Sequence, residues 1–306
     1  MARALAVAVG ILALLVVGSV LDTLLWPGPL LTFFRPQLTL ALALAAALAL
    51  PVRRFGTAVG GLVVALLGVA LLVPAVRDAG PEVPAEPATT VRLLALNLAH
   101  RNDDVAAVVG LIRRERPNVI TFSELTPEWA RALAPALASY RVRATEPREG
   151  AIGIGLYGRD ALSQPRVVRL FGDERPSVEA ALALPDGRRA RILSVHPPSG
   201  LEPGSLAAHR DAFSALGAWA EERGPLAAIC GDLNAVPWMR TLRATVERGG
   251  LRAIVPGGPV GGSWPRVPRR LRAPIDGCLV GSDLRARAEL GPDVGSDHLP
   301  LLVELG

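Results

Sequence analysis

The chain has 306 residues, of which 50% are hydrophobic, and its mean hydropathy of +0.35 is high for a protein that lies wholly in water. Every basic residue is arginine, and the formal charge of +5 suits an anionic partner without choosing among nucleic acid, phospholipid and a phosphorylated metabolite. Two cysteines, Cys230 and Cys278, are too few for a disulfide framework. Both lie in apolar stretches, so we predict buried free thiols, with a single bridge as the alternative.

Three apolar stretches come first in the chain, at residues 4–26, 36–52 and 55–76. Crossing about 30 Å of hydrocarbon takes about 17 to 25 helical residues, so each stretch is long enough to span, and the middle one is the shortest. A cleaved signal peptide is the alternative for the first stretch, although its apolar run is longer than a usual signal core. We therefore predict an anchor of three transmembrane helices over residues 1–76.

Charges in the short loops give this anchor an orientation. Arg3 precedes the first stretch, Arg53 and Arg54 separate the second from the third, and Arg35 alone lies between the first and second. Because positively charged loops stay in the cytoplasm, we predict a multi-pass protein of the cell membrane with everything after residue 76 outside the cytoplasm. This orientation reverses if the middle stretch does not span.

Residues 77–90 contain three prolines and no hydrophobic periodicity, which predicts an extended linker before a domain at 91–306. Strand-like and helix-like segments then alternate. Strands are predicted at 91–97 and 118–124, with a helix between them that has an Asp cap and stops before Pro117. Thr126 and Pro127 begin the next helix as its cap and first residue.

Three strand-like runs follow, at 151–159, 177–185 and 190–196, and their short spacing favours antiparallel neighbours. A helix at 205–223 leads to a strand that ends in the sequence GDLN, and Pro237 opens another helix. The last two strand candidates cover 273–280 and 298–305. Sheets with interspersed helices predict a layered α/β sandwich.

Polar residues gather where these apolar strands end, which is where scaffolds usually display catalytic side chains. Hydrolysis of a phosphate ester needs a cation, a positioned water and support for the leaving oxygen, and carboxylate and amide oxygens suit Mg²⁺. The strand-end residues are Asn97, Glu124, His196, Asp232 with Asn234, Asp276, and Asp297 with His298.

In this order, the strand-end residues of 91–306 resemble the endonuclease/exonuclease/phosphatase superfamily, which includes DNase I, abasic-site endonucleases, sphingomyelinases and inositol phosphatases. The resemblance implies a four-layer α/β sandwich of DNase I type. It also implies a Mg²⁺ cofactor, with Mn²⁺ as the alternative. Glu124 would be the principal metal ligand, assisted by Asn97 and Asp297.

The same resemblance implies the roles of the catalytic residues. Asp276 would orient His298, because a carboxylate fixes the tautomer of an imidazole and raises its basicity. Either His298 or Asp232 would act as the base. Asn234 would orient the phosphate or the water, and His196 would contact the phosphate or assist the leaving group.

Asp297 and His298 are adjacent, and neighbours in a regular strand point to opposite faces. Both can face one site only in irregular backbone, which Gly295 and Ser296 immediately before them favour. The remaining histidines, His100 and His209, are interpreted as surface or helix residues.

Three spans before such a domain are similar in architecture to the teicoplanin-resistance proteins of the VanJ type. That similarity implies a phosphatase or phosphodiesterase acting on lipid-linked envelope intermediates, such as polyprenyl diphosphate, with a role in glycopeptide resistance. An anchor suits a lipid substrate because it confines both to one plane. The alternatives are a phospholipid or sphingomyelin phosphodiesterase and an extracytoplasmic nuclease, whose DNA the arginines between Arg266 and Arg272 could hold. The same guanidiniums could face anionic headgroups, and 4% aromatic residues give little sign of a base-stacking platform.

Overall fold

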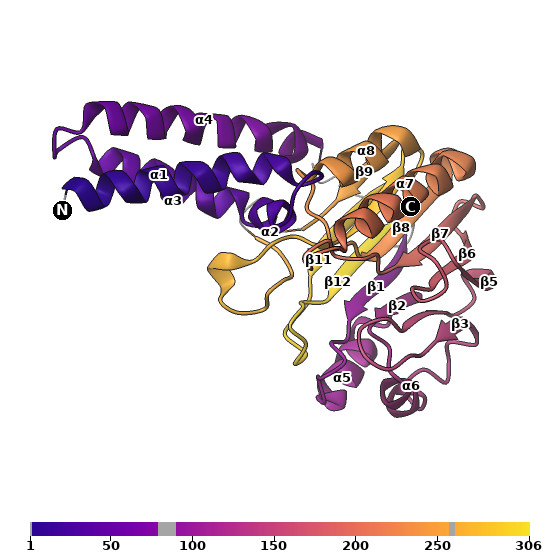
Figure 1. The fold of residues 1–306 in the computed structure, drawn as a ribbon. Coiled ribbons are helices and arrows are strands. Elements are labelled where there is room, and N and C mark those ends of the chain that lie inside the picture. The colour runs from indigo at the N-terminus through magenta and orange to yellow at the C-terminus, as the bar shows by residue number, and fades with distance from the viewer. Residues whose placement is uncertain (1, 79–89, 257–260) are drawn as a thin grey trace.

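The apolar N-terminal segment forms a bundle of helices that projects from a two-sheet domain (Figure 1). The computed structural model describes residues 2–306 apart from 79–89 and 257–260. Most of the predicted linker at 77–90 therefore lies outside the described residues. The bundle contains α1 (Ala2–Gly18), η1 (Ser19–Leu21), α2 (Gly28–Phe33), α3 (Arg35–Leu48) and α4 (Phe55–Asp78).

Two segments of this bundle are long and apolar enough to cross a membrane, judged by length and composition: Ala2–Leu21 and Phe55–Pro74. The third predicted span, at 36–52, is not confirmed, because α3 stops at Leu48 and has only 14 residues. At 1.5 Å per residue it reaches about 21 Å, short of the hydrocarbon thickness.

The bundle exposes an apolar surface. Among the described residues, every exposed large hydrophobic side chain lies in it except Val267 and Leu271. Helix α3 packs against both α1 and α4 and runs opposite to both (Figure 1). The amino terminus and the turn before α4 therefore lie together at the end of the bundle that is remote from the domain.

The rest of the described chain forms two six-stranded sheets. The first has the order β11-β12-β1-β2-β4-β3, and the second has the order β5-β6-β7-β8-β10-β9. The first sheet consists of β1 (Val91–Asn97), β2 (Val119–Ser123), β3 (Val142–Glu146), β4 (Ile154–Gly158), β11 (Ala286–Leu290) and β12 (Leu301–Leu305). The second consists of β5 (Leu162–Val168), β6 (Ser177–Ala183), β7 (Arg189–Val195), β8 (Ala227–Asp232), β9 (Leu251–Ile254) and β10 (Asp276–Gly281).

Only two of the strand pairs are parallel, β1 with β2 and β7 with β8, among the pairings of the described chain. The expectation that the three runs at 151–196 are all antiparallel neighbours is half right. Strands β6 and β7 pair in this way, but β4 lies in the other sheet. The reason is that an intervening strand, β5, carries the chain from one sheet to the other.

The sheets pack face to face and carry helices on their outer faces, so the predicted four-layer α/β sandwich is confirmed. Successive side chains of β1 point to opposite faces of its sheet: Leu93 faces the core between the sheets, whereas Leu94 faces the helices. Helices α5 (Val105–Glu115) and α6 (Pro127–Leu133) cover the first sheet. Helices α7 (Leu206–Arg223) and α8 (Arg240–Gly249) cover the second.

The two predicted helix caps are confirmed, because in each helix the side chain of the cap residue accepts a hydrogen bond from a backbone amide of the first turn. Asp104 accepts a hydrogen bond from Ala107 N at the start of α5, and Thr126 accepts one from Trp129 N at the start of α6. The helix expected to open at Pro237 begins instead at Arg240, because residues 237–239 form a turn.

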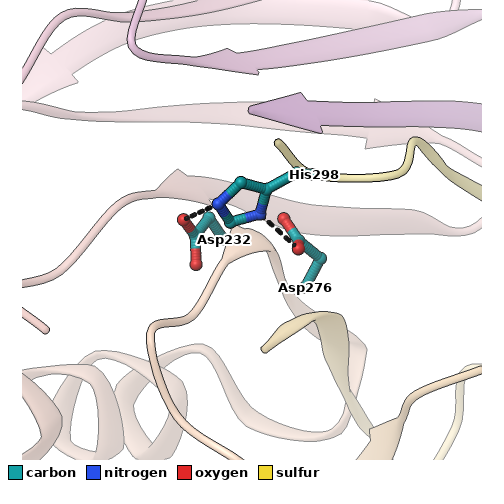
Figure 2. A group of neighbouring side chains, drawn as sticks. All are labelled: Asp232, Asp276 and His298. Atoms are coloured by element: carbon teal, nitrogen blue, oxygen red, sulfur yellow. Dashed lines mark hydrogen bonds and ion pairs between the residues drawn. The ribbon is translucent and has the colours of Figure 1, made fainter. Parts of the chain in front are cut away.

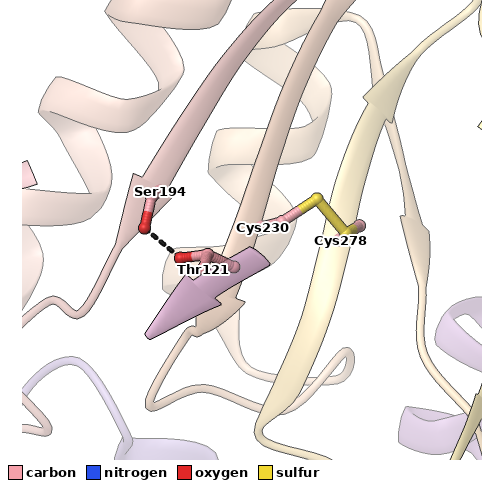
Figure 3. Close-up of a disulfide and its surroundings, with 4 residues drawn as sticks. All are labelled: Thr121, Ser194, Cys230 and Cys278. Atoms are coloured by element: carbon pink, nitrogen blue, oxygen red, sulfur yellow. Dashed lines mark hydrogen bonds between the residues drawn. A yellow bond between two sulfur atoms is a disulfide. The ribbon is translucent and has the colours of Figure 1, made fainter. Parts of the chain in front are cut away.

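The prediction of free thiols is wrong, because Cys230 and Cys278 form a disulfide (Figure 3). They lie directly opposite each other on the antiparallel strands β8 and β10, although 48 positions separate them in sequence. On a neighbouring pair of strands, the hydroxyls of Thr121 and Ser194 hydrogen bond from one sheet to the other. Polar and covalent links thus reinforce the interior behind the strand ends.

The bundle is docked on the domain through α2 and the turn before it. Phe33 is fully buried in the same core as Trp238, and the Trp238 indole donates to Thr32 O over 2.7 Å. Asp22, also buried, accepts a hydrogen bond from Arg240 N over 3.1 Å. These contacts fix the base of the bundle against the second sheet and its helices.

Candidate active site

The strand pairing explains why the predicted residues meet. Asn97 ends β1 and Glu124 follows its parallel neighbour β2, so both lie at the same edge of the first sheet. His196 follows β7 and Asp232 ends its parallel neighbour β8. Asp276 lies opposite Asp232 in the antiparallel register of β10. These strand ends of the first and second sheets meet at one end of the sandwich.

A buried chain of three side chains lies at the centre of this end (Figure 2). His298 Nδ1 is 2.7 Å from Asp276 Oδ2, and His298 Nε2 is 3.7 Å from Asp232 Oδ2. All three are at most 5% exposed. Two serines hold the backbone around them, because Ser263 Oγ accepts from Asp276 N and Ser296 Oγ accepts from His298 N.

The charges of the three side chains Asp276, His298 and Asp232 depend on one another. Burial alone would lower the pKa of His298, but the negative charges of Asp276 and Asp232 raise it to about 10. Burial would likewise raise the pKa of Asp232, but the positive charge of His298 and contacts with His196 hold it well below its usual value. Burial raises the pKa of Asp276 despite the opposing charge of His298. His298 is therefore an imidazolium held between acidic groups at neutral pH.

Asp232 also joins the other predicted residues. Its Oδ2 accepts from Asn97 Nδ2 over 3.0 Å and lies 3.3 Å from His196 Nε2. Its Oδ1 accepts from Asn234 N, while Asn234 Nδ2 donates to Pro197 O. His196 Nδ1 is buried and has no hydrogen-bond partner among the described residues. This nitrogen has unused hydrogen-bonding capacity in a buried position.

Glu124 has a second set of contacts. Its Oε1 accepts from Asn97 Nδ2 over 3.1 Å, so this one amide joins Glu124 to Asp232. Its Oε2 accepts from His100 N and lies 2.6 Å from His100 Nδ1. Burial would raise the pKa of Glu124, but these hydrogen bonds lower it, and the carboxylate is ionised at neutral pH. His100 is exposed, as its interpretation as a surface residue predicts, and it also contacts the site through Glu124.

Glu124 and Asp297 line the same open pocket, which has a volume of about 370 Å³ and also includes His100. The backbone at 295–298 is irregular, as predicted, so the exposed Asp297 faces the pocket while its neighbour His298 is buried. Asp297 Oδ2 accepts from the indole of Trp264 over 3.2 Å. The structure thus separates the predicted residues into a buried chain and an open acidic pocket, with Asn97 between them.

Strained backbone marks the same region. Ala99, Glu124 and Asn234 have left-handed backbone with φ of 54°, 55° and 49°, a conformation that costs a non-glycine residue about 1 kcal/mol or more. Strain of this kind persists where surrounding contacts fix the backbone, and it clusters at functional sites.

Arg175 is a further charged residue that the sequence did not single out. Burial lowers its pKa, while the charges of Glu202, Asp232 and Glu124 oppose that change. The guanidinium therefore feels the negative charges of Asp232 and Glu124 in the acidic site. By contrast, His209 is confirmed as a helix residue with a structural role, since it hydrogen bonds to Pro198 O.

Comparison with known proteins agrees with this geometry. The model of the endonuclease/exonuclease/phosphatase family matches residues 94–298, a range that contains all eight predicted site residues. No protein of curated function matches the sequence.

Solved structures show the same fold at low sequence identity. The human Nocturnin catalytic domain with bound sulfate has a TM-score of 0.60 at 15% identity, covering 73% of this chain and 96% of its own. An endonuclease/exonuclease/phosphatase from Bacteroides vulgatus has a TM-score of 0.57 at 16% identity, covering 71% and 99%. D. rerio TDP2 complexed with a single-strand DNA product has a TM-score of 0.54 at 14% identity, also covering 71% and 99%.

Proposed function

The chain belongs to the endonuclease/exonuclease/phosphatase family, and from this premise we propose that it is a metal-dependent phosphoesterase anchored in the cell membrane. Its catalytic domain lies outside the cytoplasm and acts on a lipid-linked phosphate ester or diphosphate of the envelope, such as polyprenyl diphosphate. Removal of such an intermediate is the basis for a role in glycopeptide resistance of the teicoplanin type.

The buried chain of Asp276, His298 and Asp232 is the main support for this activity. Asp276 fixes the His298 ring through Nδ1, so that Nε2 faces Asp232 and the site. The imidazolium offsets negative charge that develops on the phosphate, and Asp232 orients the attacking water and takes its proton. The unpartnered Nδ1 of His196 is available to the phosphate or the leaving oxygen.

The open acidic pocket fits a hard divalent cation, Mg²⁺ or Mn²⁺. Glu124 is ionised there and Asp297 shares the pocket, so carboxylate oxygens are available. Asn97 directs its Nδ2 to Glu124 and Asp232 while its oxygen accepts from Ala99 N, so in this orientation it positions the carboxylates. A bound cation would offset the charge of the phosphate oxygens.

A second group of metal-ligand type exists, because atoms of Asp232, Asp276 and His298 lie within 4.8 Å of one another. We assign the cation to the Glu124 pocket instead. The imidazole and the carboxylate of Asp276 already satisfy each other in the buried group, whereas the pocket is open.

Three features support anchoring with the domain outside the cytoplasm. Two helices have the length and composition of membrane spans. Helices α1 and α4 both begin at the end of the bundle remote from the domain (Figure 1). Arg3 lies in the first turn of α1, and Arg53 and Arg54 directly precede α4, so their charges agree with the positive-inside rule for this orientation. The Cys230–Cys278 disulfide is typical of an oxidising compartment.

A nuclease is the second candidate, because the fold is shared with D. rerio TDP2, whose structure contains a single-strand DNA product. The test is to purify the full chain in detergent with Mg²⁺ and measure phosphate release from polyprenyl diphosphate beside nicking of plasmid DNA. We expect release of phosphate without nicking. Nicking without phosphate release would replace the lipid substrate with a nucleic acid.

A further inference from the structure

One surface loop has an unusual combination of side chains. Residues 264–273, here called the arginine loop, carry Arg266, Arg269, Arg270 and Arg272. Val267 is 65% exposed and Leu271 is 44% exposed, and these are the only exposed large hydrophobic side chains outside the bundle in the described chain. Exposed apolar side chains interleaved with arginines are typical of a surface that meets lipid headgroups.

The loop has an ordered frame. At its neck, Trp264 and Ala273 exchange two backbone hydrogen bonds. Within it, the Arg272 guanidinium donates twice to Arg266 O, over 3.0 and 2.7 Å. Val267 and Leu271 are therefore held outward on a closed loop, so their exposure is a feature of the fold.

The arginine loop lies against the end of the bundle that meets the domain. Gln37, near the start of α3, donates to Arg272 O over 3.3 Å, and the Trp264 ring lies 6.5 Å from the rings of Phe33 and Phe34. Figure 1 shows the loop, in gold, projecting beside the end of the bundle that meets the domain. A membrane that holds the bundle would have its surface at this level.

The loop also leads directly to the candidate active site. The Trp264 indole donates to Asp297, and its ring centroid lies 6.4 Å from that of His298. Arg266 N donates to Asp297 O over 2.6 Å. A phosphate held at the base of the loop is therefore adjacent to the acidic pocket.

We propose that the arginine loop is a second membrane contact, which inserts Val267 and Leu271 among the headgroups of an anionic bilayer and guides lipid phosphates to the site. This inference rests on the membrane anchoring in the proposed function. A nucleic-acid backbone would also attract the guanidiniums, but it gives no reason for two outward apolar side chains between them. Anionic lipid accounts for both features.

The test uses the full chain in nanodiscs of phosphatidylcholine mixed with phosphatidylglycerol and a lipid carrying a nitroxide quencher. An environment-sensitive fluorophore is placed on Leu271→Cys, with Leu66→Cys in the bundle and Ser282→Cys in an exposed turn as references. The native cysteines are bridged and do not react. We expect the Leu271 label to be quenched several-fold more than the Ser282 label. Pure phosphatidylcholine, or the double change Arg269→Gln and Arg270→Gln, is expected to reduce this difference.

Equal quenching of the labels at 271 and 282, with strong quenching at 66, would overturn the inference and leave the anchoring intact. Absence of quenching at 66 would refute the anchoring and the inference together. A shift of the 271 label on adding duplex DNA, without quenching by lipid, would assign the loop to nucleic acid. None of these outcomes depends on catalysis, so a failed phosphatase assay is a separate result.

Discussion

Two carboxylates, those of Asp276 and Asp232, stabilise the protonated form of His298. Asp276 is the closer of them, with its Oδ2 2.7 Å from His298 Nδ1. Changing Asp276→Asn removes the largest influence that raises the pKa of His298. We expect kcat to fall about 100-fold to 1000-fold, because the ring loses both its orientation and its positive charge.

The pH profile distinguishes this role from a structural one. Activity that needs the imidazolium is present below the pKa of His298 and lost as pH rises through about 10 in the unaltered protein. In Asp276→Asn the loss should occur at lower pH, and it is measured as kcat against pH. An unchanged profile, or an equal effect of the exposed control Asp186→Asn, would contradict the assignment.

Arg175 carries a positive charge on which the charges of Asp232 and Glu124 act. Because a guanidinium binds phosphate oxygens, Arg175→Met should raise KM about tenfold and change kcat less. Steady-state kinetics checks this, with the exposed Arg189→Met as the matched control and Arg175→Lys expected to recover part of the loss. A change in kcat alone would show that Arg175 does not bind substrate.

Among the individual site residues, the sequence predicted those that end or directly follow apolar strands. Asn97, Glu124, His196 and Asp232 lie at strand ends, where both the pattern and the chemistry are visible. His100 and Arg175 come from loops, and their side chains reach the site only through backbone turns that no periodicity reveals. Left-handed backbone at Ala99 is one such turn.

Strand β6 contains a buried acid with an electrostatic role. Glu179 is 1% exposed and accepts hydrogen bonds from Arg166, Arg191 and Arg223. Burial alone would raise its pKa, but these three guanidiniums lower it from 4.5 to about 2. Its stabilising contribution is therefore complete above pH 4.5 and is lost as pH falls through about 2.

We expect Glu179→Gln to destabilise the protein by about 2 kcal/mol at neutral pH, since three arginines would lose a shared partner and two of them remain partly solvated. The variant should also lose less stability than the unaltered protein between pH 4.5 and 2. Thermal unfolding of the full chain in detergent measures both, with Glu289→Gln on the exposed edge strand β11 as the control. Parallel declines in both proteins would refute this role.

Strands and helices were predictable from the sequence where their side chains are strongly buried. Strands β1 and β2 and helices α5 and α6 follow from apolar runs, caps and prolines. Strands β3, β5, β9 and β11 were missed, because all four lie at sheet edges and three of them, β3, β5 and β11, mix exposed with buried residues. The disulfide depends on the register between β8 and β10, which sequence spacing does not specify.

For the whole molecule, the placement of the domain depends on whether α3 counts as a span. Its 14 residues are short, yet it packs against the two longer helices and runs antiparallel to both (Figure 1). We therefore expect the domain and the amino terminus on opposite sides of the membrane. A reporter active only outside the cytoplasm, fused after Gly306, should be active, and the same reporter fused before Arg3 should be silent. The reverse pattern would place the domain in the cytoplasm.

The structure joins the apolar helix bundle, a docking turn and the candidate active site. Trp264 contacts Phe33 and Phe34 on one side and the site residues Asp297 and His298 on the other. The sequence predicted a bundle and a domain as separate parts. It did not show that they share a core, because Phe33 and Trp238 lie 205 positions apart.

The most direct test of the enzymatic account is metal-dependent phosphate release from polyprenyl diphosphate by the full chain, measured for the unaltered protein, Glu124→Gln and the exposed control Glu128→Gln. We predict that EDTA stops the reaction, that Mg²⁺ or Mn²⁺ restores it in the unaltered protein and in Glu128→Gln, and that Glu124→Gln stays at least about 100-fold slower. Phosphate release that persists in EDTA, or in Glu124→Gln at the unaltered rate, would contradict the account.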